Sequence, residues 1–183
     1  LGDVYKRQVE LASGESIAAD LVICNGDPAQ IYRSLVPAEN RKRWTNRRID
    51  ALKYSMGLYV LYFGTDRKYT DVEHHTIVFG DQYQELLQRI FAGEPAGDDL
   101  SLYLHRPTAT DPNLAPEGKD TFYVLAPVPN LQRHDWLAVQ DQVRERVIDI
   151  LEQRILPDLR QHMDVCFDLD PMQFDADYAP RWG

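Results

Sequence analysis

The segment DLSLYLHRPTATDPNLAPEGKDTFYVLAPVPN, residues 99–130, decides the fold of this chain. From Leu100 onward leucine occupies every second position, which is the period-two pattern of a half-buried strand. Residues 121–126 are rich in aromatic and β-branched side chains and favour a second strand. The prolines between these runs exclude a helix, because proline lacks a donor N–H and restricts the residue before it. We therefore predict two neighbouring strands joined by a long, stiff loop, with Pro127 and Pro129 ending the second strand.

The composition is that of a globular, acidic protein. Of 183 residues, 44% are hydrophobic and 27% charged, enough to bury a core of one to one and a half domains. The net charge of −9 argues against general nucleic-acid binding. Cys24 and Cys166 lie far apart without a CxxC, so neither a metal knuckle nor a disulfide framework is indicated, and a reducing cytoplasm is expected. No apolar run reaches the roughly 18 residues of a membrane-spanning helix, so any membrane contact is expected to be peripheral.

Both ends of the sequence look cut. Residues 1–8, LGDVYKRQ, resemble translated adaptor sequence and are expected to be non-native. The other end stops on Trp182-Gly183 without a helix stop signal. We expect an internal fragment of a longer protein.

A strand, a tight turn and a helix are predicted near the N-terminus. Residues 21–24 are a short apolar run that suits a strand buried on both faces. Asn25, Gly26, Asp27 and Pro28 follow, with Asp27 as the N-cap and Pro28 as the first helical residue. Such a turn points backbone N–H groups at whatever lies above the strand, often a nucleotide or a phosphate. The alternative is an ordinary turn in which the glycine serves only backbone geometry.

One basic segment interrupts the acidic chain. Residues 38–53 carry a net charge of +4, which leaves −13 for the remainder. Trp44 and Ile49 lie among the basic side chains, so the segment could rest on an anionic membrane surface. A solvated helix pair between domains is the alternative. The basic residues are Arg41, Lys42, Arg43, Arg47, Arg48 and Lys53.

The remaining pattern is that of a mixed α/β chain. Apolar periodicity and turn residues bound each element. We predict a hairpin around Gly14, strands at 54–63, 74–79 and 164–169, a helix at 82–91, and a long amphipathic helix that Asp135 caps and Pro157 ends.

No motif in the chain specifies catalysis. The nucleotide-binding, nucleophile-elbow and HExxH zinc motifs are all absent from the sequence. His74 and His75 are adjacent in a predicted strand, where consecutive side chains point to opposite faces, so no metal site is predicted. His105 and Arg106 are interpreted as loop anchors. Residue chemistry alone leaves the function open.

Several ordered blocks of the sequence are similar to one known family. These blocks lie at residues 19–28, 55–64, 74–80, 101–112 and 122–129. They resemble the bacterial phytoene desaturases, the FAD-dependent carotenoid desaturases within the amine-oxidase-like flavoproteins. One departure is Gly26, where that family usually has alanine.

The resemblance implies an α/β (α+β) fold built from part of a Rossmann-like flavin domain and an inserted substrate domain. The substrate domain would have a mixed, largely antiparallel sheet with helices. Residues 9–36 would belong to the flavin domain, 37–163 to the substrate-binding domain, and 164–183 to the return toward the flavin domain. Asn25 to Pro28 would lie near FAD. The dinucleotide fingerprint and the catalytic residues would lie outside the chain, so FAD would not be held tightly by it.

The resemblance further implies desaturation of phytoene toward lycopene by hydride transfer to FAD. Phytoene is a hydrocarbon without a polar handle, so its recognition requires an apolar tunnel. The tunnel candidates are Tyr59, Leu61, Phe63, Tyr103 and Tyr123, and plain sheet core is the alternative for each. Two other functions stay open. One is a related flavoenzyme for another isoprenoid, such as a diapophytoene desaturase, a carotenoid isomerase or a retinol saturase; the other is a noncatalytic module that binds apolar ligands.

Overall fold

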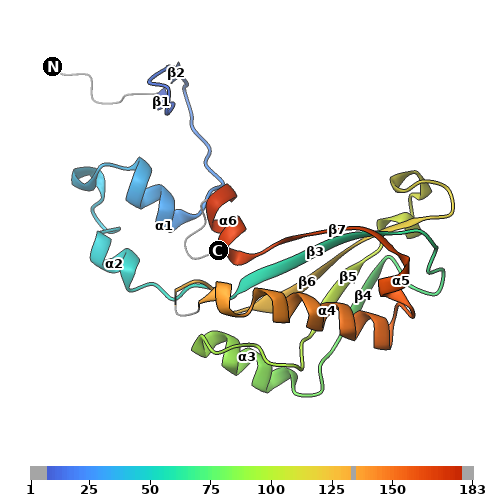
Figure 1. Ribbon diagram of the computed structural model, residues 1–183. Helices are drawn as coiled ribbons and strands as arrows, with labels where there is room; N and C mark the ends of the chain where they lie inside the picture. Colours follow the sequence, from blue (N-terminus) through green and yellow to red (C-terminus); the bar gives the residue numbers. More distant parts are fainter. Residues whose placement is uncertain (1–7, 133–134, 179–183) are drawn as a thin grey trace.

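The computed structural model describes residues 8–132 and 135–178. Its main body is a five-stranded sheet with helices along one side, and a set of short N-terminal elements stands apart from that sheet (Figure 1). The predicted combination of helices with a largely antiparallel sheet is confirmed. In the part of the chain described, no helix combines the length and the apolar content needed to cross a bilayer.

The sheet has the strand order β4-β5-β6-β3-β7, and every neighbouring pair is antiparallel. The decisive segment supplies β5 and β6, which pair with Tyr103 opposite Leu125, so the predicted neighbouring strands are confirmed. The strands are β3 (Gly57–Thr65), β4 (His75–Val78), β5 (Leu102–His105), β6 (Asp120–Val128) and β7 (Met163–Leu169).

Strand β6 continues further than the sequence predicts. It runs through Pro127, which lies opposite Leu58 of β3, and ends at Val128. The prediction that Pro127 ends the strand is therefore wrong. The pairing of β6 with β5 ends at Leu125, so beyond that residue β6 has a partner on one side only. A residue without an N–H is tolerated at such a locally free edge.

A buried ion pair anchors the loop between β5 and β6. Arg106 and Asp120 lie at the two ends of this loop, and Arg106 Nε donates to Asp120 Oδ2 at 2.9 Å. The same carboxylate accepts hydrogen bonds from Thr108 Oγ1 and from the Tyr69 backbone N–H. Two single 3-10 turns, η3 (Pro107–Ala109) and η4 (Pro112–Leu114), shape the loop between these anchors. The prediction that Arg106 is a loop anchor is confirmed.

Helices α3 (Tyr83–Ala92) and α4 (Gln140–Arg154) cover one face of the sheet (Figure 1). Leu86 and Ile90 of α3 join Val147 and Leu151 of α4 in one core with the inward-facing strand residues. The long helix begins later than predicted. Asp135 makes no capping hydrogen bond with its side chain, and a 3-10 turn, η5 (Trp136–Ala138), precedes α4. Trp136 is turned into the core, which explains why it does not extend the helix.

The N-terminal elements are short and only partly match the prediction. The hairpin is confirmed, and Gly14 adopts the left-handed conformation that its turn requires. Residues 21–24, in contrast, form no strand, and Leu21 and Ile23 are 76% and 86% exposed. A strand needs a hydrogen-bonding neighbour, and none of the described strands pairs with this segment. The elements are β1 (Gln8–Glu10), β2 (Ser16–Ala18), α1 (Pro28–Gln30), the π-helical turn η1 (Ile31–Leu35), η2 (Ala38–Asn40) and α2 (Asn46–Asp50).

The C-terminal part of the chain returns to the sheet. After α5 (Leu159–His162), β7 pairs along β3, and α6 (Pro171–Tyr178) follows. Strand β7 begins at Met163 and so runs across the domain boundary predicted at 163/164. The division into segments 9–36, 37–163 and 164–183 stays a prediction. Residues 1–7 and 179–183 lie outside the described residues, and Gln8 belongs to β1.

Candidate functional site

The five tunnel candidates lie on opposite faces of the sheet. Tyr59, Leu61 and Phe63 point from β3 into the core beneath α3 and α4, where they are 0%, 0% and 3% exposed. Tyr103 of β5 and Tyr123 of β6 point to the other face, away from the core that α3 and α4 share with the sheet in the described part of the chain. The structure therefore brings together two of the five candidates on an accessible surface and places three in the packed interior.

Aromatic side chains form a continuous row across this open face of the sheet. Tyr62 stacks on Phe167 of β7 with ring centroids 4.9 Å apart, and it lies 5.8 Å from Tyr123. Tyr123 in turn lies 6.0 Å from Tyr103 and 4.5 Å from the His105 ring. We call these five residues the aromatic row. It links β7, β3, β6 and β5 through side chains that are half-buried or exposed.

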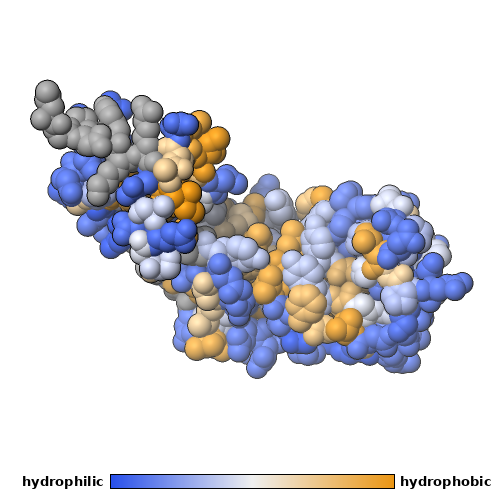
Figure 2. All heavy atoms as spheres, turned by 90° about the horizontal axis from the view of Figure 1, so that it is seen from above, coloured by the Kyte–Doolittle hydropathy of each residue, from blue (hydrophilic) through white to orange (hydrophobic). Residues whose placement is uncertain are grey.

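A shallow apolar cavity of about 310 Å³ lies on the open face. Tyr62, Tyr123 and Phe167 of the aromatic row line it together with Pro107 and Val165, and the tunnel candidate Phe63 also borders it. Leu58, Ile77 and Val165 on the same face are also exposed. In Figure 2, hydrophobic patches are surrounded by hydrophilic residues over the part of the molecule that contains the sheet. The face has the apolar character that a hydrocarbon ligand requires.

Tyr59 of β3 and Cys166 of β7 both have raised pKa values. Tyr59 donates its hydroxyl to Asp168 Oδ2 at 2.8 Å. Burial, assisted by that carboxylate, raises the pKa of Tyr59 far above its usual range, so the phenol stays neutral. Burial likewise raises the pKa of the Cys166 thiol. A neutral thiol is a poor nucleophile.

Three histidines meet at the edge of the open face. His74 lies just before β4, His75 begins that strand, and His105 ends β5 directly opposite His75. The prediction that His74 and His75 point apart is wrong, because only His75 lies in the strand where side chains alternate. Burial and the two neighbouring imidazoles lower the pKa of His105.

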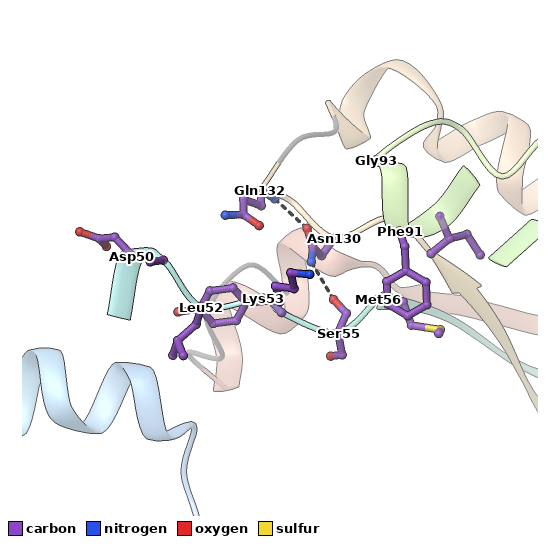
Figure 3. Close-up of a pocket in the computed structure, with 12 residues that line it drawn as sticks. Asp50, Leu52, Lys53, Ser55, Met56, Phe91, Gly93, Asn130 and Gln132 are labelled. Carbon is purple, nitrogen blue, oxygen red and sulfur yellow. Dashed lines mark hydrogen bonds between the residues drawn. The ribbon is translucent and has the colours of Figure 1, made fainter. Parts of the chain in front are cut away.

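A second, larger cavity of about 740 Å³ lies where the segment after α2 meets the sheet. Lys53, Ser55, Asn130 and Gln132 bring polar groups to it, and Phe91 of α3 closes one side (Figure 3). Asn130 connects two segments that line the cavity. Its side-chain amide donates to the Ser55 carbonyl, and its Oδ1 accepts from the Gln132 backbone N–H. This cavity is more polar than the one on the open face.

The predicted cofactor turn is present, but its groups are partly occupied. Asp27 Oδ1 accepts a hydrogen bond from the Gln30 backbone N–H at 2.9 Å, which confirms Asp27 as N-cap with Pro28 at the first helical position. Gly26 does not have a positive φ, and an added Cβ would meet Ile31 at an ordinary 3.5 Å. Alanine fits there as well, so the backbone does not demand glycine. The proposed contact of Asn25 to Pro28 with FAD stays a prediction.

The basic segment contains a small cluster of its own. Trp44 stacks on Tyr32 at 5.1 Å, and the Arg48 guanidinium lies over the Trp44 ring. Arg41 Nη1 donates to Asn46 Oδ1. The basic side chains that are exposed are Lys42, Arg43, Arg47, Arg48 and Lys53, whereas Arg41 is half-buried.

Tyr62 and Phe167 are site residues that the sequence reasoning missed. Tyr62 follows Leu61 and therefore points to the opposite face. Alternation along β3 could have separated the two sets, but it could not show which face the helices cover. Phe167 required the pairing of β7 with β3, which joins residues about a hundred positions apart.

Two solved structures share this fold. An oxidoreductase from Methanosarcina mazei has a TM-score of 0.54 at 18% identity, covering 86% of this chain and 32% of its own. A protein from Pyrococcus furiosus has a TM-score of 0.53 at 16% identity, covering 91% of this chain and 35% of its own. No protein-family model matches the chain. At such identities the likeness shows the fold alone.

The sequence relatives are more specific. A neurosporene-forming phytoene desaturase from Cereibacter sphaeroides is 42% identical over 181 residues, 96% of this chain and 35% of that protein. A lycopene-forming phytoene desaturase from Paracoccus is 41% identical over 177 residues, 96% of this chain and 35% of that protein. A 4,4′-diapophytoene desaturase from Methylomonas is 37% identical over 171 residues, 92% of this chain and 33% of that protein. The chain spans about a third of the length of these curated relatives, and over that third it is a relative of the bacterial phytoene desaturases.

Proposed function

We propose that the chain forms the substrate side of an FAD-dependent desaturase that converts phytoene toward lycopene. The observation that carries this proposal is the aromatic row on the open sheet face, in a chain whose relatives are named phytoene desaturases. A long polyene has only its apolar surface to offer, and each buried CH₂ group contributes about 0.8 kcal/mol. A continuous row of aromatic rings suits such a ligand.

The two faces of the sheet have different proposed roles. Tyr103 and Tyr123, together with Tyr62 and Phe167, contact the hydrocarbon directly. Tyr59, Leu61 and Phe63 were predicted in the tunnel, and that prediction remains open. Their complete burial beneath the helices supports a different role, in which they hold β3 flat against the core and so position Tyr62.

FAD enters the proposal through the turn at Asn25 to Pro28. When bound, the flavin accepts the hydride that desaturation removes from the substrate. Asp27 already caps α1 and Pro28 has no N–H, so this turn suits a position beside the cofactor and not the main phosphate cradle. The segments that hold FAD tightly therefore belong to the remaining two thirds of the proposed enzyme.

Peripheral membrane contact through the basic segment is part of the same proposal. A hydrocarbon substrate resides in the bilayer, and the exposed side chains of Lys42, Arg43, Arg47 and Arg48 would face its anionic surface. Reversing Arg47 and Arg48 to glutamate is expected to abolish cosedimentation with vesicles rich in anionic lipid. An Arg89→Glu variant on α3 is the matched control, and unchanged binding by the Arg47/Arg48 variant contradicts the membrane contact.

A graft tests the main proposal. Residues 9–178 replace the matching third of the Cereibacter sphaeroides enzyme, and product from phytoene is measured by absorbance. The expected result is a coloured polyene with FAD retained, reduced severalfold by Tyr62→Ser and by Tyr123→Ser through loss of ring contacts. A folded graft that retains FAD and leaves phytoene unchanged contradicts the proposal.

A second substrate has a specific observation in its favour. The Methylomonas relative acts on 4,4′-diapophytoene, as its name states, and it is nearly as similar to this chain. An apolar face without polar end groups does not select chain length by itself. Offering both substrates to the same graft separates the two, because the preferred one shows the higher kcat/KM.

A further inference from the structure

The histidine cluster at the edge of the open face is the strongest feature that the proposed function does not use. His74, His75 and His105 each offer one ring nitrogen, and these atoms lie within 4.8 Å of one another. His74 Nε2 and His105 Nε2 are already 2.7 Å apart. Three imidazoles converge here from the start of β4 and the end of β5, although they are separated by up to 31 positions in sequence.

We propose that His74, His75 and His105 form a site for one divalent transition metal, with Zn²⁺ as its natural occupant. Imidazole is the preferred ligand of Zn²⁺, Cu²⁺ and Ni²⁺. With Zn–N bonds of about 2.0–2.1 Å, tetrahedral ligand atoms lie about 3.3 Å apart, so small side-chain rotations bring the three nitrogens into place. Two of the three histidines are half-buried and His75 is exposed, which leaves the fourth position open to solvent or to a ligand on the sheet face.

The hydrogen bonds around the cluster prepare two of the imidazoles for a metal. Thr110 Oγ1 lies 2.7 Å from His74 Nδ1 and 3.3 Å from the Pro107 carbonyl oxygen; when its proton points to that carbonyl, the hydroxyl accepts from His74 Nδ1. The His75 Nδ1 lies 2.6 Å from the Tyr103 hydroxyl. A proton on Nδ1 leaves the Nε2 lone pair free. Metal-ligating histidines characteristically donate their second nitrogen to an oxygen in this way.

The third histidine shows that protein groups alone do not satisfy the cluster. His105 Nδ1 is buried and has no hydrogen-bond partner among the described residues. Its Nε2 faces another imidazole nitrogen, where at most one hydrogen can lie between the two. A metal ion between His74 and His105 replaces this close contact of two nitrogens with two coordinate bonds.

A bound ion would cross-link the elements at the edge of the open face. His74 is tied to the β5–β6 loop through Thr110, and His75 is tied to the aromatic row through Tyr103. One ion would therefore join the first residue of β4, the last residue of β5 and that loop. This inference does not rest on the proposed desaturase function, because it concerns the residues of the sheet edge alone.

Zinc binding to the folded chain tests the site. After dialysis against chelator, titration with ZnCl₂ alone is expected to give one bound ion per chain, and Co²⁺ in its place is expected to give the intense visible absorption of a four-coordinate ion. His74→Gln, His75→Gln and His105→Gln should each weaken zinc binding at least about tenfold. His162→Gln is the matched control, because His162 pairs with Asp66 and is not one of the three clustered histidines.

A second variant tests the site while keeping all three histidines, so its effect does not depend on the loss of a ligand. Tyr103→Phe removes the oxygen beside His75 Nδ1 and is expected to weaken zinc binding about tenfold, whereas Tyr62→Phe on the same face leaves it unchanged. Circular dichroism checks that each variant is folded. Absence of zinc binding by the folded chain, or binding that is lost only in the His162 variant, overturns the proposal.

Discussion

The two faces of the same strands carry different kinds of side chain for different reasons. On the covered face Tyr59, Leu61 and Phe63 pack against helices and are almost completely buried. On the open face Tyr62 and Phe167 stack on each other and remain accessible. The covered face therefore stabilises the fold, and the open face is available for a ligand. The comparison predicts that substitutions on one face change the free energy of unfolding and substitutions on the other change binding.

The largest effect is expected at the ion pair beside the β5–β6 loop. Arg106→Met leaves the Asp120 carboxylate buried without its charge partner, which costs about 3–5 kcal/mol of unfolding free energy. Urea denaturation followed by circular dichroism measures it. Lys119→Met is the control, because Lys119 pairs with Asp164 at the surface, where ion pairs contribute little. Equal destabilisation by both variants would contradict the role assigned to the buried pair.

The next effect separates the two faces on one strand. Leu61→Ala removes a fully buried side chain from the covered face and is expected to cost about 3 kcal/mol. Leu58→Ala, three positions earlier and 40% exposed, is expected to cost about 1 kcal/mol or less. Denaturation midpoints of the two variants provide the measurement. Similar losses would mean that the open face is also packed in solution.

A smaller loss of stability is expected from the hydrogen bond between Tyr59 of β3 and Asp168 of β7. Tyr59→Phe removes the hydroxyl that donates to Asp168 and should cost about 1 kcal/mol. A double-mutant cycle with Asp168→Asn isolates the pair, and the coupling energy is expected to account for most of that loss. A coupling energy near zero would show that this hydrogen bond does not contribute to stability.

The smallest effect on stability is expected on the open face. Phe167→Ser changes a side chain that is 56% exposed, so the unfolding free energy should move by less than about 0.5 kcal/mol. Binding of an apolar fluorescent dye such as anilinonaphthalenesulfonate should fall about twofold or more, because one wall of the apolar cavity is lost. A stability loss as large as that of Leu61→Ala would erase the distinction between the faces.

Local pattern predicted much of the sheet. Alternating leucines placed Leu100 to Leu104 in a strand whose alternate residues share one face, and the proline-rich stretch was correctly interpreted as a loop. The end of β6 was misplaced, since a proline disrupts a ladder only where a neighbouring strand needs its N–H. The strand predicted at residues 21–24 failed for a related reason, because an apolar run becomes a strand only beside a partner.

The candidate site was less predictable than the fold. Tyr103 and Tyr123 were named from the sequence, but their neighbours Tyr62 and Phe167 were not. The resemblance to phytoene desaturases supplied the substrate class, and the comparisons support it over a third of those proteins. A metal site at the histidines was not predicted from the sequence, because His74 was placed inside a strand that begins one residue later.

By itself the sequence determined which residues alternate, where the chain must turn and which family it resembles, because these properties depend on neighbours within a few positions. Only the tertiary structure decided which face of the sheet the helices cover. It also decided that Arg106 meets Asp120 and that three histidines converge at the end of β5. These outcomes depend on contacts between distant segments, whose free energy exists only once the chain has closed the loops between them.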